Sequence, residues 1–401
     1  METKIKALDR SCLKPEDFKE AVEILKSGGL VAMPTETVYG LAGDAMDEEA
    51  AKKIYAAKGR PSDNPLIVHI ADEKALYELA SDVPREALAA AKRFWPGPLT
   101  MILNKSDRVP FGTTGGLSTV AIRFPSDNIA NMLIKTSGLY LAAPSANASG
   151  RPSTTRAEHV YEDLNGRIPL ILDGGSCKIG LESTIIDLSG ISSGKKPLIL
   201  RPGFITKEEL EEVIPGIEYD PVVISRKPSE SKVAKAPGMK YRHYAPAGTL
   251  TIVEGKSEAV VNKINAEAAD KKYKRIGILA TKETRSLYKG VQYDDEALQN
   301  NLKKLRPISL KFEEKVASGS VGGSIELEDI RQHLSLEEPV IFTVGSREDD
   351  ASIAAELFEA LRNCDELALD VIYSESFEDG PLCQAIMNRL IKAAGYSIVY
   401  V

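Results

Sequence analysis

Short apolar runs alternate along the N-terminal half of the chain with segments whose apolar positions recur at helical spacing. Helical spacing over residues 15–27 predicts a helix that ends at Gly28-Gly29, and a second helix is predicted over residues 84–95. The apolar runs predict strands at residues 30–33, 66–68, 99–103, 120–122, 170–172, 184–186 and 198–200. Short strands mixed with helices indicate an α/β layer fold.

The pattern breaks down between residues 206 and 248, where residues 222–237 are rich in serine, lysine and proline, as linkers are. Beyond this segment, strands are predicted at residues 250–253, 276–279, 340–344 and 367–373, with helices at 346–363 and 381–394. Residues 307–335 take no assignment. We therefore predict a domain over residues 1–205, a linker over 206–248 and a smaller α/β domain over 249–401.

Composition narrows the class of protein. The chain has 401 residues, of which 43% are hydrophobic and 27% charged, so two globular domains with real cores are expected. A net charge of −7 argues against a protein that coats nucleic acid, although a local basic groove stays open. The cysteines Cys12, Cys177, Cys364 and Cys383 form no C-x-x-C pair, so we predict reduced thiols and neither a zinc site nor a disulfide framework.

No apolar run approaches the roughly 18 residues that span a bilayer, and the first ten residues are charged. We expect a cytoplasmic protein without a membrane contact. The phosphate-loop pattern G-x-x-x-x-G-K-[ST], the G-x-G-x-x-G fingerprint and the H-E-x-x-H metal helix do not occur in the sequence. No metal ligand set is therefore predicted.

Polar residues stand at the ends of the predicted strands, where an open α/β sheet presents its loops to ligands. Residues 34–40 (P-T-E-T-V-Y-G) offer two hydroxyls and a carboxylate, although an ordinary turn with a helix cap explains them equally well. Lys58 and Arg60 lie in a loop stiffened by two prolines, which suits a polyphosphate, and solvated surface cations are the alternative.

Two polar residues fall within or just after buried strands. His69 follows a predicted strand, where a structural role is the ordinary one. Arg123 lies at the end of another, and its charge needs a partner, which is either a ligand carboxylate or phosphate or an internal Asp or Glu. The sequence leaves this choice open.

Residues 143–153 are dense in small hydroxyl and amide side chains, which let a ligand approach the backbone closely. A flexible surface connector has the same composition. Residues 180–184 and 200–203 add a hydroxyl and another cation, Arg201, at strand boundaries, with caps and turns as the alternative.

Taken together and in this order, five segments resemble the Sua5/YrdC family: residues 34–40, 58–69 (K-G-R-P-S-D-N-P-L-I-V-H), 145–153 (S-A-N-A-S-G-R-P-S), 182–187 (E-S-T-I-I-D) and 200–205 (L-R-P-G-F-I). Residues 237–246 resemble the linker of long, Sua5-type members, and residues 385–390 their C-terminal domain. The resemblance thus spans nearly the whole chain. It implies a YrdC-like twisted mixed sheet with helices, followed by a smaller Rossmann-like α/β domain.

The resemblance also implies an activity. Family members are threonylcarbamoyl-AMP synthases, which use L-threonine, bicarbonate and ATP to make the intermediate for N6-threonylcarbamoyladenosine at position 37 of tRNA. By resemblance, the expected catalytic residues are Lys58, Arg60, Arg123 and Ser145. The residues expected to bind L-threonine are Thr35, His69, Arg123 and Ser183. The residues expected to bind ATP are Lys58, Arg60, Ser62, Thr119, Ser145, Asn147, Ser153, Arg201 and Tyr241.

Further expectations concern partners. Mg2+ is expected to bridge the triphosphate, and the product is expected to pass to a tRNA threonylcarbamoyl transferase, with at most a weak contact to tRNA itself. The aromatic and basic residues 241–244 are expected to form a lid over the site. Asp127 departs from the family pattern, which has a histidine there, and so does Gly380-Pro381-Leu382-Cys383. An RNA-binding module without catalysis and a carbamoyl-adenylate synthase stay open as alternatives.

Overall fold

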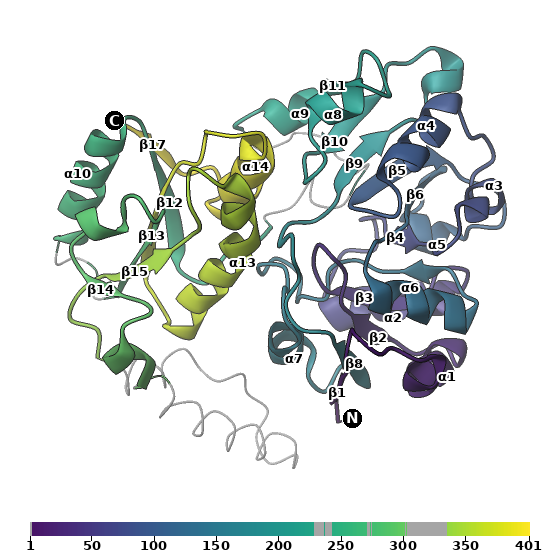
Figure 1. Ribbon diagram of the computed structural model, residues 1–401, viewed down its shortest axis with the longest axis horizontal. Helices are drawn as coiled ribbons and strands as arrows, with labels where there is room; N and C mark the ends of the chain where they lie inside the picture. The colour runs from purple at the N-terminus through teal and green to yellow at the C-terminus, as the bar shows by residue number, and fades with distance from the viewer. Residues whose placement is uncertain are drawn as a thin grey trace. The chain divides into compact units, whose positions relative to one another are not determined.

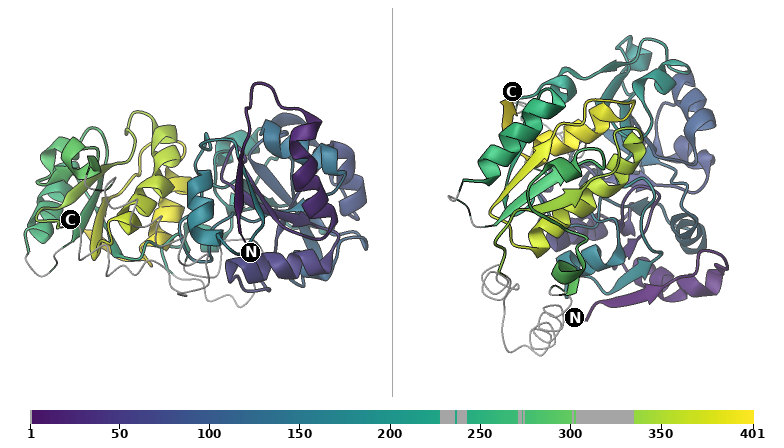
Figure 2. Two further views of the ribbon diagram at one scale, coloured as in Figure 1. Left: turned by 90° about the horizontal axis from the view of Figure 1, so that it is seen from below. Right: turned by 60° about the vertical axis from the view of Figure 1, so that its left-hand side comes forward.

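The computed structural model describes residues 2–227, 236, 243–270, 273, 275–300, 302 and 335–401. The chain divides into two compact units, Met1–His243 and Tyr244–Val401, each built on its own β-sheet (Figure 1; Figure 2). Of residues 307–335, which took no assignment from the sequence, all but residue 335 lie outside the described residues, as does Tyr241.

Unit 1 is built on an eleven-stranded mixed sheet, ordered β1-β8-β2-β3-β7-β4-β6-β5-β9-β10-β11. In chain order these strands are β1 (Lys4–Ala7), β2 (Val31–Met33), β3 (Gly40–Asp44), β4 (Ile67–His69), β5 (Leu99–Asn104), β6 (Thr119–Arg123), β7 (Leu141–Ala142), β8 (Leu170–Asp173), β9 (Thr184–Asp187), β10 (Leu198–Arg201) and β11 (Glu218–Tyr219). Parallel and antiparallel neighbours are interspersed, which confirms the predicted mixed sheet.

The helices of unit 1 are α1 (Lys19–Lys26), α2 (Glu48–Lys58), α3 (Leu76–Leu79), α4 (Arg85–Phe94), α5 (Phe111–Thr114), α6 (Asn128–Ser137), α7 (Ala157–Leu164), α8 (Lys207–Glu211) and α9 (Pro221–Ile224). Local chemistry sets their ends. Asp47 accepts a hydrogen bond from Glu49 N at the start of α2, and Gly59 ends this helix with a left-handed φ of 62°. Lys58, the last residue of α2, is therefore held in a fixed position next to the turn at Gly59.

The two halves of the sheet in unit 1 are covered differently. Around β2, β3 and β8, one face packs on α1 and α6, and the other belongs to the main core, to which α2, α4 and α7 contribute. Around β4, β6, β5, β9 and β10, the first face carries only a small apolar cluster. Its buried members are Ile67, Ile102, Ala121, Ile185, Leu200 and Ala236, so among the described residues no helix contributes to it. We call this the open face.

Unit 2 has a six-stranded, wholly parallel sheet, ordered β14-β15-β13-β16-β12-β17. Its strands are β12 (Thr249–Glu254), β13 (Ile276–Ala280), β14 (Val291–Gln292), β15 (Val340–Thr343), β16 (Val371–Glu375) and β17 (Ile398–Tyr400). The long helices α10 (Ser257–Ala268), α13 (Asp350–Glu366) and α14 (Cys383–Ala393) lie on both sides of it, α10 on one and the other two opposite (Figure 1). This is the predicted Rossmann-like layering.

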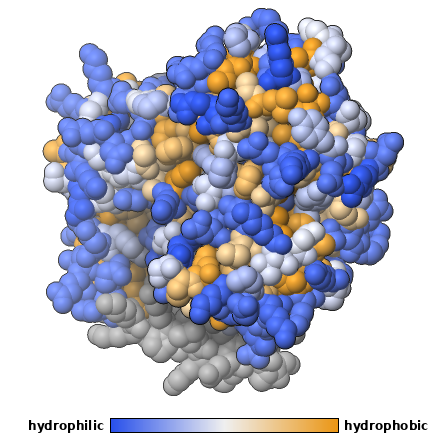
Figure 3. Space-filling view, turned by 45° about the vertical axis from the view of Figure 1, so that its right-hand side comes forward, coloured by the Kyte–Doolittle hydropathy of each residue, from blue (hydrophilic) through white to orange (hydrophobic). Residues whose placement is uncertain are grey.

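Differences from the predicted elements are local. The short strands β1, β3, β7, β11, β14 and β17 were not predicted. β16 begins at Val371 rather than at residue 367, because α13 runs on to Glu366 and Ala368 turns the chain with a φ of 49°. On the face shown in Figure 3, hydrophobic residues are exposed in small groups between hydrophilic ones. In the part of the chain that the structure describes, no helix has the length and apolar character to cross a membrane.

Candidate active site

Strand register places three polar side chains in one row on the open face. His69 of β4 is the register partner of Arg123 of β6, which is in turn the partner of Thr100 of β5. Successive side chains of a strand point to opposite faces of the sheet. The row therefore lies on the same face as Ile67, Ala121 and Ile102, each of which stands two residues from a member of the row on the same strand. Val68, Ile122 and Met101 point the other way, into the main core.

Arg123 has an internal partner. Its Nη2 lies 2.7 Å from Oε1 of Glu36, in the loop after β2, and the two side chains are only 5% and 9% exposed. The choice that the sequence left open is thus settled for this structure in favour of an internal carboxylate. The pair is incomplete, however, because within the described residues neither Glu36 Oε2 nor Arg123 Nε has a hydrogen-bond partner.

His69 is a neutral neighbour of this pair. Burial, together with the positive charge of Arg123, lowers the pKa of His69 to about 3. Its Nδ1 lies 3.1 Å from the carbonyl oxygen of Ile67, which favours the tautomer protonated at Nδ1. The imidazole therefore offers polar contacts at neutral pH without adding charge.

A hydroxyl pair adjoins the same row. The hydroxyl oxygens of Ser183 and Thr100 lie 2.8 Å apart, and Arg201 donates to the Ser183 hydroxyl (3.0 Å) and to the Ser183 carbonyl (3.0 Å). All three side chains are buried. Arg201 and Ser183, predicted for different ligands, therefore form one hydrogen-bonded group, and Thr100 joins it as a residue that was not predicted.

Lys58 organises a second group. Its ammonium donates to the carbonyl oxygens of Ser145 (2.5 Å) and Asn147 (2.5 Å), and the Ser145 hydroxyl donates to the Asn147 side-chain oxygen (2.5 Å). Lys58 is 2% exposed, so the alternative of a solvated surface lysine is wrong. The structure thus joins three of the predicted site residues at one loop.

Arg60 and its neighbours are less tightly grouped. Arg60 is buried and donates from Nη2 to the carbonyl oxygens of Asn64 (3.3 Å) and Pro65 (3.1 Å), which stiffens its own loop. Ser62 is exposed in that loop, and Thr119 opens β6 half-buried, on the same face as Arg123. The predicted contacts of Ser62 and Thr119 with ATP stay predictions.

Backbone hydrogen bonds hold the three site loops together. Ile179 N donates to Glu36 O, and Gly180 N donates to Thr37 O. Tyr39 donates through its N to Thr154 O and accepts at its O from Ala146 N. The loops at residues 34–39, 145–154 and 179–183 therefore form one continuous wall. Ser153 extends it, because its hydroxyl donates to Glu182 Oε1 (2.5 Å).

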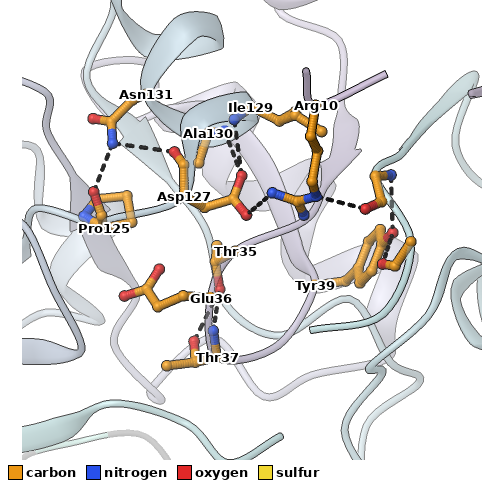
Figure 4. A network of polar contacts seen from close by, with 12 residues as sticks. Arg10, Thr35, Glu36, Thr37, Tyr39, Pro125, Asp127, Ile129, Ala130 and Asn131 are labelled. Carbon is orange, nitrogen blue, oxygen red and sulfur yellow. Dashed lines mark hydrogen bonds and ion pairs between the residues drawn. The ribbon is translucent and has the colours of Figure 1, made fainter. Parts of the chain in front are cut away.

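The loop after β2 has its own internal structure. The Thr35 hydroxyl donates to Val38 O (2.6 Å) and accepts from the backbone N of Thr37 (3.2 Å). These two hydrogen bonds of the hydroxyl stabilise the turn at residues 35–38. Figure 4 shows Glu36 beside Thr35 and Thr37, with its carboxylate directed away from this turn. The turn explains how the carboxylate is presented, and the predicted contact of Thr35 with threonine stays a prediction.

Asp127, which replaces the histidine of the family pattern, has a clear structural role. It accepts from Ile129 N and Ala130 N at the start of α6 and pairs with Arg10 at 2.5 Å (Figure 4). The carboxylate caps the helix and holds the N-terminal segment against it. Its place is therefore explained without a ligand.

The predicted lid is only partly described. Tyr241 and residue 242 lie outside the described residues, while Tyr244 is 4% exposed and packs on Phe358 of α13, inside unit 2. Ala236 is fully buried in the apolar cluster of the open face. Ala236 thus belongs to the open face of unit 1, whereas Tyr244 belongs to unit 2.

The described site offers fixed cations, hydroxyls and the buried carboxylates of Glu36 and Glu182. The nearby thiol of Cys177 is no nucleophile, because burial raises its pKa above the ordinary range. No group of three His, Cys, Asp or Glu side chains in the described ranges is placed to hold a metal ion. Such a site suits binding and charge neutralisation of anions rather than a covalent enzyme intermediate.

Comparison with known proteins gives matches to both units. A family model described as "Telomere recombination", for the Sua5, YciO and YrdC proteins, matches residues 23–203. A model described as "Threonylcarbamoyl-AMP synthase, C-terminal domain" matches residues 205–395. The two matches together run from residue 23 to residue 395 with only residue 204 between them, so β1 and β17 lie outside the matched range.

Individual relatives match over nearly the full length. The threonylcarbamoyl-AMP synthase of Pyrococcus abyssi is 43% identical over 381 residues, which are 95% of each chain. That of Bacillus subtilis is 41% identical over 95% of this chain and 93% of its own. The crystal structure of P. abyssi Sua5 complexed with L-threonine superposes with a TM-score of 0.80 at 41% identity, with all of both chains covered.

Proposed function

Because this chain belongs to the Sua5 family of threonylcarbamoyl-AMP synthases, we propose that it condenses L-threonine, bicarbonate or CO2, and ATP to L-threonylcarbamoyladenylate and pyrophosphate. The observation that carries the proposal is the grouping of Lys58, Ser145, Arg123, Ser183 and Arg201 along one wall and one open sheet face of unit 1. Family membership favours this activity over the RNA-binding module and the carbamoyl-adenylate synthase.

The amino acid is proposed to bind at the polar row. Arg123 would take its carboxylate, and the hydroxyls of Ser183 and Thr35 and the neutral His69 would complete the site. That an amino acid binds is supported by the complex of P. abyssi Sua5 with L-threonine. The α-ammonium group then loses a proton, the free amine adds to the carbon of CO2, and a second proton leaves the nitrogen to give the carbamate. A carbamate oxygen attacks the α-phosphorus of ATP, the bond to the bridging oxygen breaks, and pyrophosphate leaves.

ATP is proposed to bind along the wall. Lys58 and Arg60 would neutralise the phosphates, and Ser145, Asn147 and Ser153 would line the nucleotide. Arg201, anchored on Ser183, would link the nucleotide to the amino acid. Positions held by several hydrogen bonds cost no reorganisation during the reaction, which is how fixed charges stabilise a pentavalent phosphorus.

Mg2+ is proposed to enter with ATP. The oxygens offered by Ser145 and Asn147 are neutral, and the described residues hold no acidic cage, so the ion would keep phosphate oxygens and water as ligands. When bound, it would neutralise charge on the triphosphate. The chain's own contribution is to orient the nucleotide.

The remaining partners are proposed on the same basis. Threonylcarbamoyladenylate is a labile mixed anhydride, so its hand-over to a tRNA threonylcarbamoyl transferase follows from its chemistry. A weak contact with tRNA stays a proposal. The lid expected at residues 241–244 is proposed to shield the product from water; Tyr241 and residue 242 lie outside the described residues.

The direct test measures pyrophosphate release with ATP, bicarbonate and one candidate amino acid at a time. Release is expected with L-threonine, weaker release with L-serine, and none when bicarbonate or the amino acid is omitted. Release that ignores the amino acid, or that requires carbamoyl phosphate instead, contradicts the proposal. Salt-sensitive RNA binding without any release would favour the RNA-binding alternative.

A further inference from the structure

The buried ion pair of Arg123 and Glu36 is incomplete within the part of the chain that the structure describes. It joins Arg123 Nη2 to Glu36 Oε1 at 2.7 Å, yet Glu36 Oε2 and Arg123 Nε, both buried, have no partner among the described residues. Leaving a charged group's polar atom buried and unpaired is costly. A fold that keeps two such atoms side by side keeps them for something that the free protein lacks.

The two atoms define the chemistry of what fits. Arg123 offers donors to an anionic group, and Glu36 offers an acceptor to a cationic one, a few ångströms apart. An α-amino acid is a zwitterion that carries a carboxylate and an ammonium on the same carbon, so it matches both groups at once. In the free protein, Glu36 takes the place that the ligand's carboxylate would occupy on Arg123.

We infer that Glu36 is the residue that binds the substrate's α-ammonium group, and that it exchanges Arg123 for this group when the amino acid enters. The inference rests on the proposed function, because it takes the ligand to be an amino acid. One internal ion pair is then replaced by two pairs with the ligand, and both orphan atoms gain partners. Glu36 is presented for this by the turn that Thr35 closes.

The exchange also gives specificity. A ligand with a carboxylate but no ammonium displaces Glu36 from Arg123 and leaves the carboxylate buried and unpaired. Such a ligand is penalised, whereas an amino acid is not. Glu36 would thus select amino acids over hydroxy and keto acids of the same shape.

The test compares two ligands by calorimetry in wild-type protein and in Glu36→Gln: L-threonine, and 3-hydroxybutyrate, which lacks only the amine. Wild type is expected to bind L-threonine more tightly. In Glu36→Gln, the affinity for L-threonine is expected to fall by about tenfold to a hundredfold, as for a lost hydrogen bond to a charged group. The affinity for 3-hydroxybutyrate is expected to stay or to rise, because Arg123 is freed.

Two further variants make the result unambiguous. Glu36→Asp keeps the negative charge but shortens the side chain by one methylene. Its affinity for L-threonine is expected to fall less than in Glu36→Gln, while its affinity for 3-hydroxybutyrate should not fall. The same variant replaces Glu36→Gln if Glu36→Gln does not fold. Asp127→Asn removes another buried carboxylate that pairs with an arginine. This variant is expected to keep the wild-type difference in affinity between L-threonine and 3-hydroxybutyrate.

An equal loss for both ligands in the Glu36 variants would overturn the inference, since it would mean that Glu36 only positions Arg123. Unchanged binding of L-threonine would overturn it as well. Neither result touches the proposed function, which fails separately if wild-type protein binds no L-threonine and releases no pyrophosphate in its presence.

Discussion

Each unit of this chain holds an ion pair between an arginine and a buried glutamate at the end of a strand, and the two pairs differ in how many of their polar atoms have partners. In unit 2, Glu375 ends β16 and accepts from Tyr288 through Oε1 (2.7 Å) and from Arg347 through Oε2 (2.8 Å). In unit 1, Glu36 uses one oxygen on Arg123 and leaves the other without a partner in the described structure.

The arginines differ too. Arg347 is 26% exposed and also contacts Asp379 and the Ser376 carbonyl. Its charge is therefore stabilised by water as well as by several neighbours. Its Nε has no partner among the described residues. Arg123 is only 5% exposed. From this difference we expect an ion pair to be structural where both oxygens of its buried carboxylate have partners, and to bind a ligand where one of them has none.

Replacing Arg123 by methionine is expected to have the largest effect. It leaves Glu36 as an unpaired buried carboxylate, so the free energy of unfolding should fall by about 3–5 kcal/mol, and threonine-dependent pyrophosphate release should be lost. Denaturant titration and the release assay measure the two. The double variant Arg123→Met/Glu36→Gln should recover most of the stability and none of the activity; a double variant as unstable as the single one would show that the pair is not the cause.

Lys58→Met is expected to act mainly on catalysis. The ammonium ties the carbonyl oxygens of Ser145 and Asn147, and its loss should cost about 1–3 kcal/mol of stability and lower kcat/KM for ATP by about a hundredfold. Steady-state kinetics with ATP as the varied substrate is the measurement. An unchanged kcat/KM for ATP would show that Lys58 does not act on the nucleotide.

The pH dependence of stability is expected to report His69. Its pKa is about 3 in the folded protein and near 6.5 in the unfolded chain, so only the unfolded chain takes up the proton between these values, and stability falls as the pH falls below about 6.5. At pH 5 the loss should be about 2 kcal/mol. His69→Gln should lose correspondingly less stability between pH 7 and pH 5 in denaturant titrations, and an identical pH profile in both proteins would contradict the assignment.

Glu375→Gln is expected to have the smallest effect on function. It weakens a hydrogen-bonded network in unit 2, so stability should fall by about 1–2 kcal/mol, while pyrophosphate release with L-threonine should stay within about twofold of wild type. Measured beside Glu36→Gln, it is the matched control for a buried glutamate paired with arginine. A fall in the affinity for L-threonine as large as the one expected for Glu36→Gln would contradict the difference between the two pairs.

Sequence patterns anticipated the elements of this fold better than its connections. The strands with continuous apolar runs, such as β5 and β6, were predicted within a residue or two, because buried strands need such runs. The two-residue β7 and the glycine-containing β3 were not, because too few apolar residues mark them. Yet β3 and β7 are what join the halves of the sheet in unit 1.

The site was anticipated as a set of residues but not as a network. That Arg123 needs a partner followed from its burial, whereas the choice of Glu36 depends on a loop crossing that no sequence spacing reveals. Thr100 was missed although it is a polar residue inside an apolar strand, which is the same pattern that singled out Arg123. Local periodicity finds such positions, and only tertiary structure says which of them meet.

The most direct test of the account is a crystal structure of the protein with L-threonine and a non-hydrolysable ATP analogue. The account predicts both ligands on the open face of unit 1, with the threonine carboxylate on Arg123 and the triphosphate beside Lys58. Ligands bound in unit 2 at the end of β16, with the ion pair of Arg123 and Glu36 unchanged, would contradict it.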